Sequence, residues 1–159
     1  MNYNSPKEIA SEFLHAGIYK SELPFLKFIL LAFLGGAFIA FGGLLTVMVA
    51  GGMPGIGAEN PGLIKFVAGA LFPVGLIMVS VAGADLFTSN CAMLTFPLLQ
   101  KAKSPWILLK VFVLSYLFNF VGAQFVAYFM TAEVGIISHE PWSLYLEEYS
   151  LAKVNQDFY

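Results

Sequence analysis

Gly83-Ala84-Asp85-Leu86-Phe87-Thr88-Ser89-Asn90 is a short polar interruption inside a long apolar part of the chain. Residues 66–84 before it and 91–100 after it carry no charged side chain. As one straight helix, residues 62–100 would measure roughly 58 Å, whereas the hydrocarbon core of a bilayer is about 30 Å thick. Residues 91–100 alone would cover only about 15 Å as a helix, which is too short for a second crossing. We therefore predict a single transmembrane span that is broken at residues 85–90 into two half-helices.

A non-helical segment in the middle of a span predicts a permeation path. Backbone N–H and C=O groups find no water in the hydrocarbon, so such a segment is tolerated only where protein buries it or where it lines a cavity. Transporters use broken spans of this kind to direct helix ends at the solute.

The composition of the chain predicts an all-α integral membrane protein. Of its 159 residues, 58% are hydrophobic and only 11% are charged, which is more apolar than a water-soluble domain of this size requires. Long apolar runs predict three transmembrane spans, at about residues 28–50, 62–100 and 111–132. The formal net charge is −2 and the chain has no arginine, which argues against a nucleic-acid partner. No histidine falls within a predicted span, which disfavours a haem enzyme, and we expect no enzymatic activity, cofactor or metal.

Residues 1–22 predict an amphipathic helix that lies on the membrane surface. Ser5 is suited to the N-cap position, Pro6 to the first turn, and Glu8 completes a capping box. The apolar residues that recur on one face of this helix are Ile9, Phe13 and Ala16. A helix with one apolar face is typical of a segment lying at the interface between water and lipid.

The lysines predict how the chain is oriented in the membrane. Six of the eight lie before the first span or between the second and the third: Lys7, Lys20, Lys27, Lys101, Lys103 and Lys110. Because basic residues concentrate on the cytoplasmic side, we expect the N-terminus there. Residues 23–132 then form a transmembrane domain, and residues 133–159 form an extracytoplasmic segment.

The residues at the end of the interruption predict the start of the second half-helix, residues 91–99. Thr88, Ser89 and Asn90 are all favourable N-cap residues. A helix that begins here would direct unpaired backbone N–H groups and the positive end of its dipole toward the membrane centre, an arrangement that attracts anions. The Thr88 hydroxyl would add a further donor at the same place.

Two apolar pairs are candidates for constrictions of the path. Leu86 and Phe87 lie beside the predicted N-cap, where they would form a collar that excludes water. Phe72 and Leu76 lie one turn apart on the first half-helix and would form a second collar toward the outside. Spacing alone favours the alternative interpretation, in which all four are ordinary core residues of the helix bundle. Pro73 is expected to weaken the helix locally, since proline lacks an N–H donor.

Asp85 is the one acidic residue of the interruption. A bare carboxylate on the path would repel anions, and it is costly at membrane depth. We therefore expect Asp85 to be buried off the path, where it accepts hydrogen bonds from loop N–H groups and holds the break in shape. A cation-binding Asp85 is the alternative.

Gly83-Ala84-Asp85-Leu86-Phe87-Thr88-Ser89 resembles the signature of the formate/nitrite transporter family, which reads Gly, a small residue, an acidic residue, Leu-Phe-Thr, then Gly or Ser. Asn119-Phe120-Val121-Gly122-Ala123 resembles the Asn-x-x-Gly-Ala motif of that family's third span. Ala152-Lys153-Val154 resembles the lysine motif just before its fourth span. The resemblance covers essentially the whole chain and the first half of the family's length.

The resemblance implies a fold, an assembly and a set of roles. Family members are pentamers with one pore per protomer, each protomer being an aquaporin-like fold of six spans in two inverted repeats, and they pass small monovalent anions. Thr88 would face the solute beside Ser89 and Asn90, and Gly83, Asp85 and Asn119 would shape the loop. Leu86 and Phe87 would line the inner constriction, and Phe72 and Leu76 the outer one. Lys153 would attract anions into a vestibule and favour their protonation before the apolar section, although by itself it is typical of a solvated loop lysine.

The family's central pore histidine belongs to the fifth span, for which this sequence has no counterpart. The resemblance therefore implies an incomplete half of a transporter, passive or proton-coupled, in a bacterial or archaeal inner membrane. Its expected partners are the anion, the lipid bilayer, further copies of itself and a separate second-half polypeptide. The alternative is a non-transporting membrane remnant or scaffold. The sequence leaves the choice among formate, nitrite and similar anions open.

Overall fold

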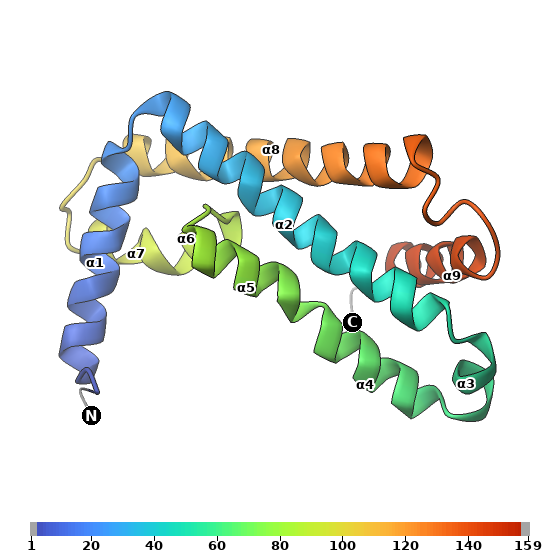
Figure 1. The fold of residues 1–159 in the computed structure, drawn as a ribbon. Helices are drawn as coiled ribbons and strands as arrows, with labels where there is room; N and C mark the ends of the chain where they lie inside the picture. The colour runs from blue at the N-terminus through green and yellow to red at the C-terminus, as the bar shows by residue number, and fades with distance from the viewer. Residues whose placement is uncertain (1–2, 157–159) are drawn as a thin grey trace. The chain divides into compact units, whose positions relative to one another are not determined.

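The structure is a computed structural model that describes residues 3–156, and these residues form helices joined by short connections (Figure 1). The elements are α1 (Pro6–Glu22), α2 (Phe25–Gly51), α3 (Pro54–Glu59), α4 (Pro61–Leu71), α5 (Pro73–Ala82), α6 (Phe87–Met93), α7 (Thr95–Leu99), α8 (Pro105–Ala127), the π-helix η1 (Tyr128–Glu133) and α9 (Trp142–Val154). The chain divides into two compact units. The first unit comprises the residues up to Gly36 together with Val81–Gly122, and the second comprises Ala37–Ser80 together with the residues from Ala123 onward.

Three helical segments of the described residues are long and apolar enough to cross a membrane. They are Phe25–Gly51, Pro61–Ala82 and Pro105–Glu133. This confirms the prediction of an all-helical membrane protein with three long apolar segments. A shorter apolar segment, Phe87–Leu99, follows the second of them and corresponds to the predicted second half-helix.

The predicted break lies between α5 and α6. Helix α5 ends at Ala82, and Gly83 turns the chain with a φ of +64°. Residues other than glycine rarely adopt this backbone conformation. Residues 84–86 have no regular structure, and α6 begins at Phe87. The N-cap residue is therefore Leu86, which makes no side-chain cap, and the expectation that Thr88 to Asn90 cap the helix is wrong. These three residues lie within α6.

A second, milder interruption separates α4 from α5. Phe72 lies between the two helices and is followed by Pro73, which begins α5. Phe72 keeps α-helical dihedral angles, so Pro61–Ala82 continues as one apolar segment. This agrees with the local weakening expected from a residue that cannot donate a backbone hydrogen bond.

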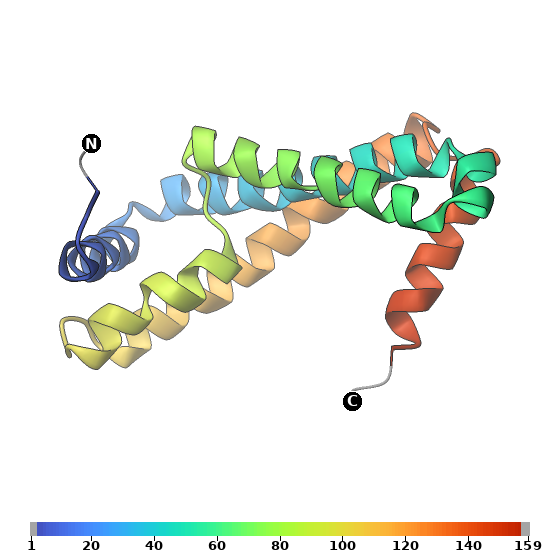
Figure 2. The ribbon, with the colours of Figure 1, turned by 90° about the horizontal axis from the view of Figure 1, so that it is seen from below.

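The first unit is organised around an apolar core between α2, α6–α7 and α8. The buried side chains of this core are Phe28, Leu94, Leu108 and Val111. Figure 2 shows α6 and α7 running alongside the first part of α8, which is consistent with these contacts. Helix α1 packs against α6 and α7, where Gly17 approaches so closely that a Cβ atom there would lie 2.5 Å from the Met93 carbonyl oxygen. The predicted capping box at the start of α1 is also present, with Ser5 and Glu8 bonding to each other's backbone N–H groups.

The second unit brings α2 and α5 together through glycines. A Cβ atom on Gly42 would lie 2.7 Å from the Phe72 carbonyl oxygen, and one on Gly75 would lie 2.7 Å from the Phe38 carbonyl oxygen. Such approaches between backbones are typical of helices that associate in membranes. At the end of this unit, the Trp142 indole N–H of α9 donates a hydrogen bond to the Met48 carbonyl oxygen at 2.9 Å.

Candidate functional site

The non-helical segment of the break is held by hydrogen bonds to α2 and α8 in the first unit. The Asp85 N–H donates to the Leu31 carbonyl oxygen at 3.0 Å. The Asn119 side chain accepts from the Phe87 N–H at 2.8 Å and donates to the carbonyl oxygens of Ala32 at 2.7 Å and Asp85 at 2.9 Å. Asn119 thus uses its acceptor and both donors to join three separate segments, and it supplies the cap that α6 lacks locally.

Two adjacent glycines of α2 allow the break to lie against that helix. A Cβ atom on Gly35 would lie 2.1 Å from the Asp85 carbonyl oxygen, and one on Gly36 would lie 1.8 Å from the Asn119 carbonyl oxygen. Neither distance leaves room for any side chain. The close approach that these glycines permit is what brings Asn119 within hydrogen-bonding distance of both α2 and the break.

The Asp85 side chain is buried, with 2% of its surface exposed. Its Oδ2 accepts hydrogen bonds from Asn90 Nδ2 at 2.9 Å and Ser115 Oγ at 2.6 Å. Its Oδ1 lies 2.7 Å from Lys20 Nζ, an ion pair whose geometry is not that of a hydrogen bond. The donors are therefore side chains, and the expectation that loop N–H groups serve Asp85 is wrong. We call Lys20, Asp85, Asn90 and Ser115 the polar cluster.

Lys20 belongs to the polar cluster although it lies on α1. Its Nζ donates to Asn90 Oδ1 at 2.7 Å and to Ser89 Oγ at 3.2 Å, in addition to its ion pair. Lys20 follows the buried Gly17 by three residues, so both lie on the face of α1 that packs on the break. Lys20 is the countercharge of Asp85, and the two opposite charges largely cancel at a distance.

Thr88 is the exposed member of the three polar residues predicted to face the solute. Asn90 is fully buried in the polar cluster, and the Ser89 hydroxyl donates to the Leu86 carbonyl oxygen at 2.8 Å. The backbone N–H groups of Thr88 and Ser89 have no acceptor within the described part of the chain, whereas the Phe87 N–H is taken by Asn119. The first turn of α6 thus presents two N–H donors and the Thr88 hydroxyl.

The two apolar pairs that were predicted to line constrictions belong to different units. Leu86 is buried, and Phe87 makes edge-to-face contacts with Phe112 and Tyr116 at centroid distances of 5.7 Å and 5.5 Å. Phe72 and Leu76, in the second unit, are both exposed. Leu86 and Phe87 therefore also have the contacts of ordinary core residues, while Phe72 and Leu76 do not.

Lys153 lies near the end of α9 in the second unit and is exposed. Its Nζ lies 5.7 Å from the centroid of the Tyr149 ring, a cation–π contact. Among the described residues, no group of histidine, cysteine and acidic side chains is placed to hold a metal ion.

Lys20 and Ser115 contact the break although the sequence did not predict a role for them there. Ser115 precedes Asn119 by four residues, so both lie on one face of α8, and this spacing is a signal that the sequence carries. For Lys20 the available signal is its position on the same helical face as Gly17, in a helix that otherwise resembles a surface helix.

Comparison with known proteins places these features in a family. A family model described as "Formate/nitrite transporter" matches residues 7–159. A "Probable formate transporter" of Methanothermobacter thermautotrophicus is 45% identical over 141 residues, which are 89% of this chain and 51% of the relative. The "Formate channel BtFdhC" of Bacillus thuringiensis is 40% identical over 80% of this chain and 48% of the relative. The "Uncharacterized transporter YrhG" of Bacillus subtilis is 39% identical over 89% of this chain and 52% of the relative. The chain spans about half the length of these relatives.

Proposed function

Because the chain belongs to the formate/nitrite transporter family, we propose that it forms one part of the wall of a path for small monovalent anions across a membrane. It is a membrane protein with three long apolar helices, and its relatives are named transporters and channels and not enzymes. We propose formate, nitrite or a similar anion as the solute, in line with the printed names of the relatives.

The observation that carries this proposal is the set of donors at the start of α6. Within residues 3–156 the N–H groups of Thr88 and Ser89 have no protein acceptor, and the exposed Thr88 hydroxyl lies beside them. An anion that leaves water needs hydrogen-bond donors that replace its hydration. Neutral donors can replace the hydration of the anion without binding it so strongly that it is not released.

The polar cluster explains how the acidic residue Asp85 can lie close to Thr88 without preventing the passage of an anion. The Asp85 carboxylate is buried and lies 2.7 Å from the Lys20 ammonium group. Two opposite charges this close act on a distant anion as a dipole, whose field falls off more steeply than that of a single charge. The role that we propose for Asp85, with Gly83 and Asn119, is to shape the break and not to contact the solute.

We propose that the apolar residues act as constrictions of the path. Leu86 and Phe87 lie directly before Thr88, and Phe72 and Leu76 are exposed on the second span. A bare anion pays a large desolvation cost in such a section, so passage as the neutral acid, coupled to a proton, is favoured. Lys153 would raise the local anion concentration at the entrance on its side of the membrane.

The rest of the path is proposed to come from sequence that corresponds to the other half of the relatives, in the same or a separate polypeptide. We further propose two inverted repeats, a pentameric assembly and a cytoplasmic N-terminus in a bacterial or archaeal cell membrane. The lysine distribution supports the orientation, since six of the eight lie on one predicted side.

The proposal is tested with a chimera in which this chain replaces the matching half of the M. thermautotrophicus relative. Thr88→Val keeps the shape of the side chain and removes its donor. Because a hydrogen bond to a charged group contributes about 1.5–3 kcal/mol, formate flux into proteoliposomes should fall roughly tenfold or more. Thr95→Val is the matched control, since the Thr95 hydroxyl donates to the Cys91 carbonyl oxygen and is not part of the donor set.

Two results would contradict the proposal. If the unsubstituted chimera assembles but passes no anion, the chain is not part of an anion path, and the scaffold alternative gains. If Thr88→Val and Thr95→Val lower the flux equally, the α6 donors do not contact the solute.

A further inference from the structure

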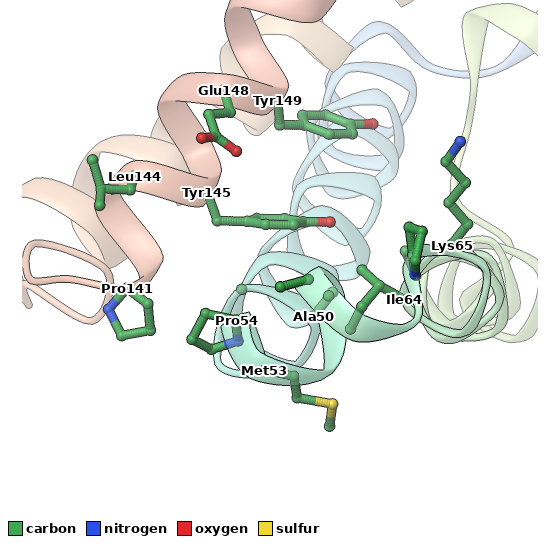
Figure 3. Close-up of a pocket in the computed structure, with 15 residues that line it drawn as sticks. Ala50, Met53, Pro54, Ile64, Lys65, Pro141, Leu144, Tyr145, Glu148 and Tyr149 are labelled. Atoms are coloured by element: carbon green, nitrogen blue, oxygen red, sulfur yellow. The ribbon is translucent and has the colours of Figure 1, made fainter.

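The second unit contains a cavity of about 640 Å³ that the anion path does not use (Figure 3). It is lined by the end of α2, by α3, by the first half of α4 and by α9. Its volume is in the range of sites for drug-sized ligands, and it greatly exceeds what a monovalent anion of a few atoms would fill. The ligand that fits this cavity is therefore a larger molecule.

Most of the cavity lining is apolar. The apolar side chains drawn in Figure 3 come from α2, α3, α4 and α9 or the residues next to them, and they include Ala50, Met53, Pro54, Ile64 and Leu144. One wall consists of the Tyr145 and Tyr149 rings, which are stacked with a centroid distance of 6.4 Å and an angle of 16° between their planes. This lining would accommodate a hydrocarbon chain.

The tyrosine hydroxyls and the lysine of the cavity lie on one side, and its carboxylate lies on the other. Figure 3 shows the hydroxyl ends of Tyr145 and Tyr149 directed toward the side where Lys65 of α4 lies. The Glu148 carboxylate lies on the α9 side, near the attachment of the two rings. Burial, and to a lesser degree the neighbouring Tyr149, raise the pKa of Tyr145, so its hydroxyl remains a donor.

The cavity also lies where we expect the protein to meet lipid headgroups. It is formed at the end of α2 and the beginning of α4, which are the ends of two apolar segments long enough to span a bilayer. Tyrosine, tryptophan and lysine are typical of this boundary, and Trp142 anchors α9 to α2 here. A ligand at this place would have its polar end in the headgroup region and its apolar end toward the hydrocarbon.

We propose that this cavity binds an anionic phospholipid. The phosphate accepts hydrogen bonds from the Lys65 ammonium group and the tyrosine hydroxyls, and an acyl chain lies along the apolar lining between α2 and α4. Basic groups at the ends of transmembrane helices recognise anionic headgroups in this way. The inference does not depend on the anion path and would hold for the chain without transport activity.

The test measures the preference of the chain for phosphatidylglycerol over phosphatidylcholine. The chain with Trp106→Phe retains a single tryptophan, Trp142, which neighbours the cavity residue Pro141. In vesicles of phosphatidylcholine that contain phosphatidylglycerol brominated on its acyl chains, quenching of Trp142 fluorescence reports lipid that lies next to the cavity. We expect stronger quenching than with brominated phosphatidylcholine at the same fraction. Lys65→Ala should lower this preference about fivefold, the effect of about 1 kcal/mol for one basic residue near the surface.

Lys7→Ala is the control, because it removes the same charge from α1 in the first unit. It should leave the preference unchanged. Ala68→Phe places a ring among the apolar lining residues of α4 and should reduce quenching by phosphatidylglycerol to the level of phosphatidylcholine, with an unchanged helical circular dichroism spectrum. Equal effects of Lys65→Ala and Lys7→Ala would overturn the proposal in favour of a general surface attraction. Unchanged quenching in well-folded Ala68→Phe would show that no acyl chain occupies the cavity.

Discussion

The ion pair between Lys20 and Asp85 is the contact whose loss should most affect the break. Lys20→Met removes the ammonium group and keeps an unbranched side chain of similar length. The Asp85 carboxylate would then retain its hydrogen bonds from Asn90 and Ser115, but it would have no countercharge, while 2% of its surface is exposed. Asp85→Asn removes the negative charge instead and leaves Lys20 with the oxygens of Ser89 and Asn90.

The magnitude follows from distance and burial. At 2.7 Å, Coulomb's law with an effective dielectric constant of about 20 gives an attraction of about 6 kcal/mol, which is offset by several kcal/mol for desolvating each ion. Removing one partner of a buried pair leaves the desolvation cost without the attraction and typically costs about 3–5 kcal/mol. We expect a cost in this range for Lys20→Met and a smaller one for Asp85→Asn, because Lys20 is 16% exposed and can turn toward solvent.

The assay is a double-mutant cycle on the purified chain in mixed micelles. Unfolding by sodium dodecyl sulfate is followed by circular dichroism for the original chain, the two single variants and the double variant. The double variant should be more stable than the sum of the single effects predicts, by about 2–4 kcal/mol, since neither charge is then left alone. Strictly additive effects would refute the view that the two charges depend on each other.

Three further predictions concern the parts that hold the break and α1. Gly36→Ala should destabilise the chain by more than about 3 kcal/mol, because its Cβ would lie 1.8 Å from the Asn119 carbonyl oxygen, whereas Gly43→Ala, with no atom within 4 Å, should be nearly neutral; equal melting temperatures would contradict this. Asn119→Leu removes three hydrogen bonds and should cost about 3 kcal/mol, with faster hydrogen exchange of the Phe87 amide, and unchanged exchange would be evidence against its capping role. The backbone N–H and the side chain of Ser5 lower the pKa of Glu8, so its support of α1 is complete above its ordinary pKa and is lost as the pH falls through the lowered value. Hydrogen exchange in the first turn of α1 should therefore accelerate in acid, and an identical acid profile in Glu8→Gln would argue against this.

An interruption of the apolar run could be predicted from the sequence, because residues 62–100 are too many for one straight span. That the two parts share one crossing stays a prediction, since Pro61–Ala82 alone is long and apolar enough to cross a membrane. The residue at which the helix after the break begins could not be predicted to within one turn. Local preference favours Thr88, Ser89 and Asn90 as caps, but the helix begins at Phe87, where Asn119 accepts the first N–H group. A contact from a distant residue thus replaced the local cap.

The roles of the polar residues were predictable only in part. Asp85 was expected to be buried, since a carboxylate at membrane depth requires partners, and its burial is confirmed. Its partners were not foreseen, because Lys20 lies 70 residues from Asn90 along the chain and has the appearance of one of several orientation-setting lysines. A sequence pattern indicates which residue needs a partner, but pairing between distant helices is a property of the folded chain.

The polar cluster links the position of α1 to the shape of the break. A buried ion pair contributes little net stability compared with apolar side chains of the same size, so stability alone does not account for it. Its geometry is specific, however, because one ammonium group contacts acceptors on residues 85, 89 and 90 together. A shift of α1 along α6 by one turn, about 5.4 Å, would break all three contacts and leave the carboxylate unpaired, whereas purely apolar surfaces would tolerate such a shift at lower cost. The pair therefore fixes α1 in one register on the segment that presents Thr88.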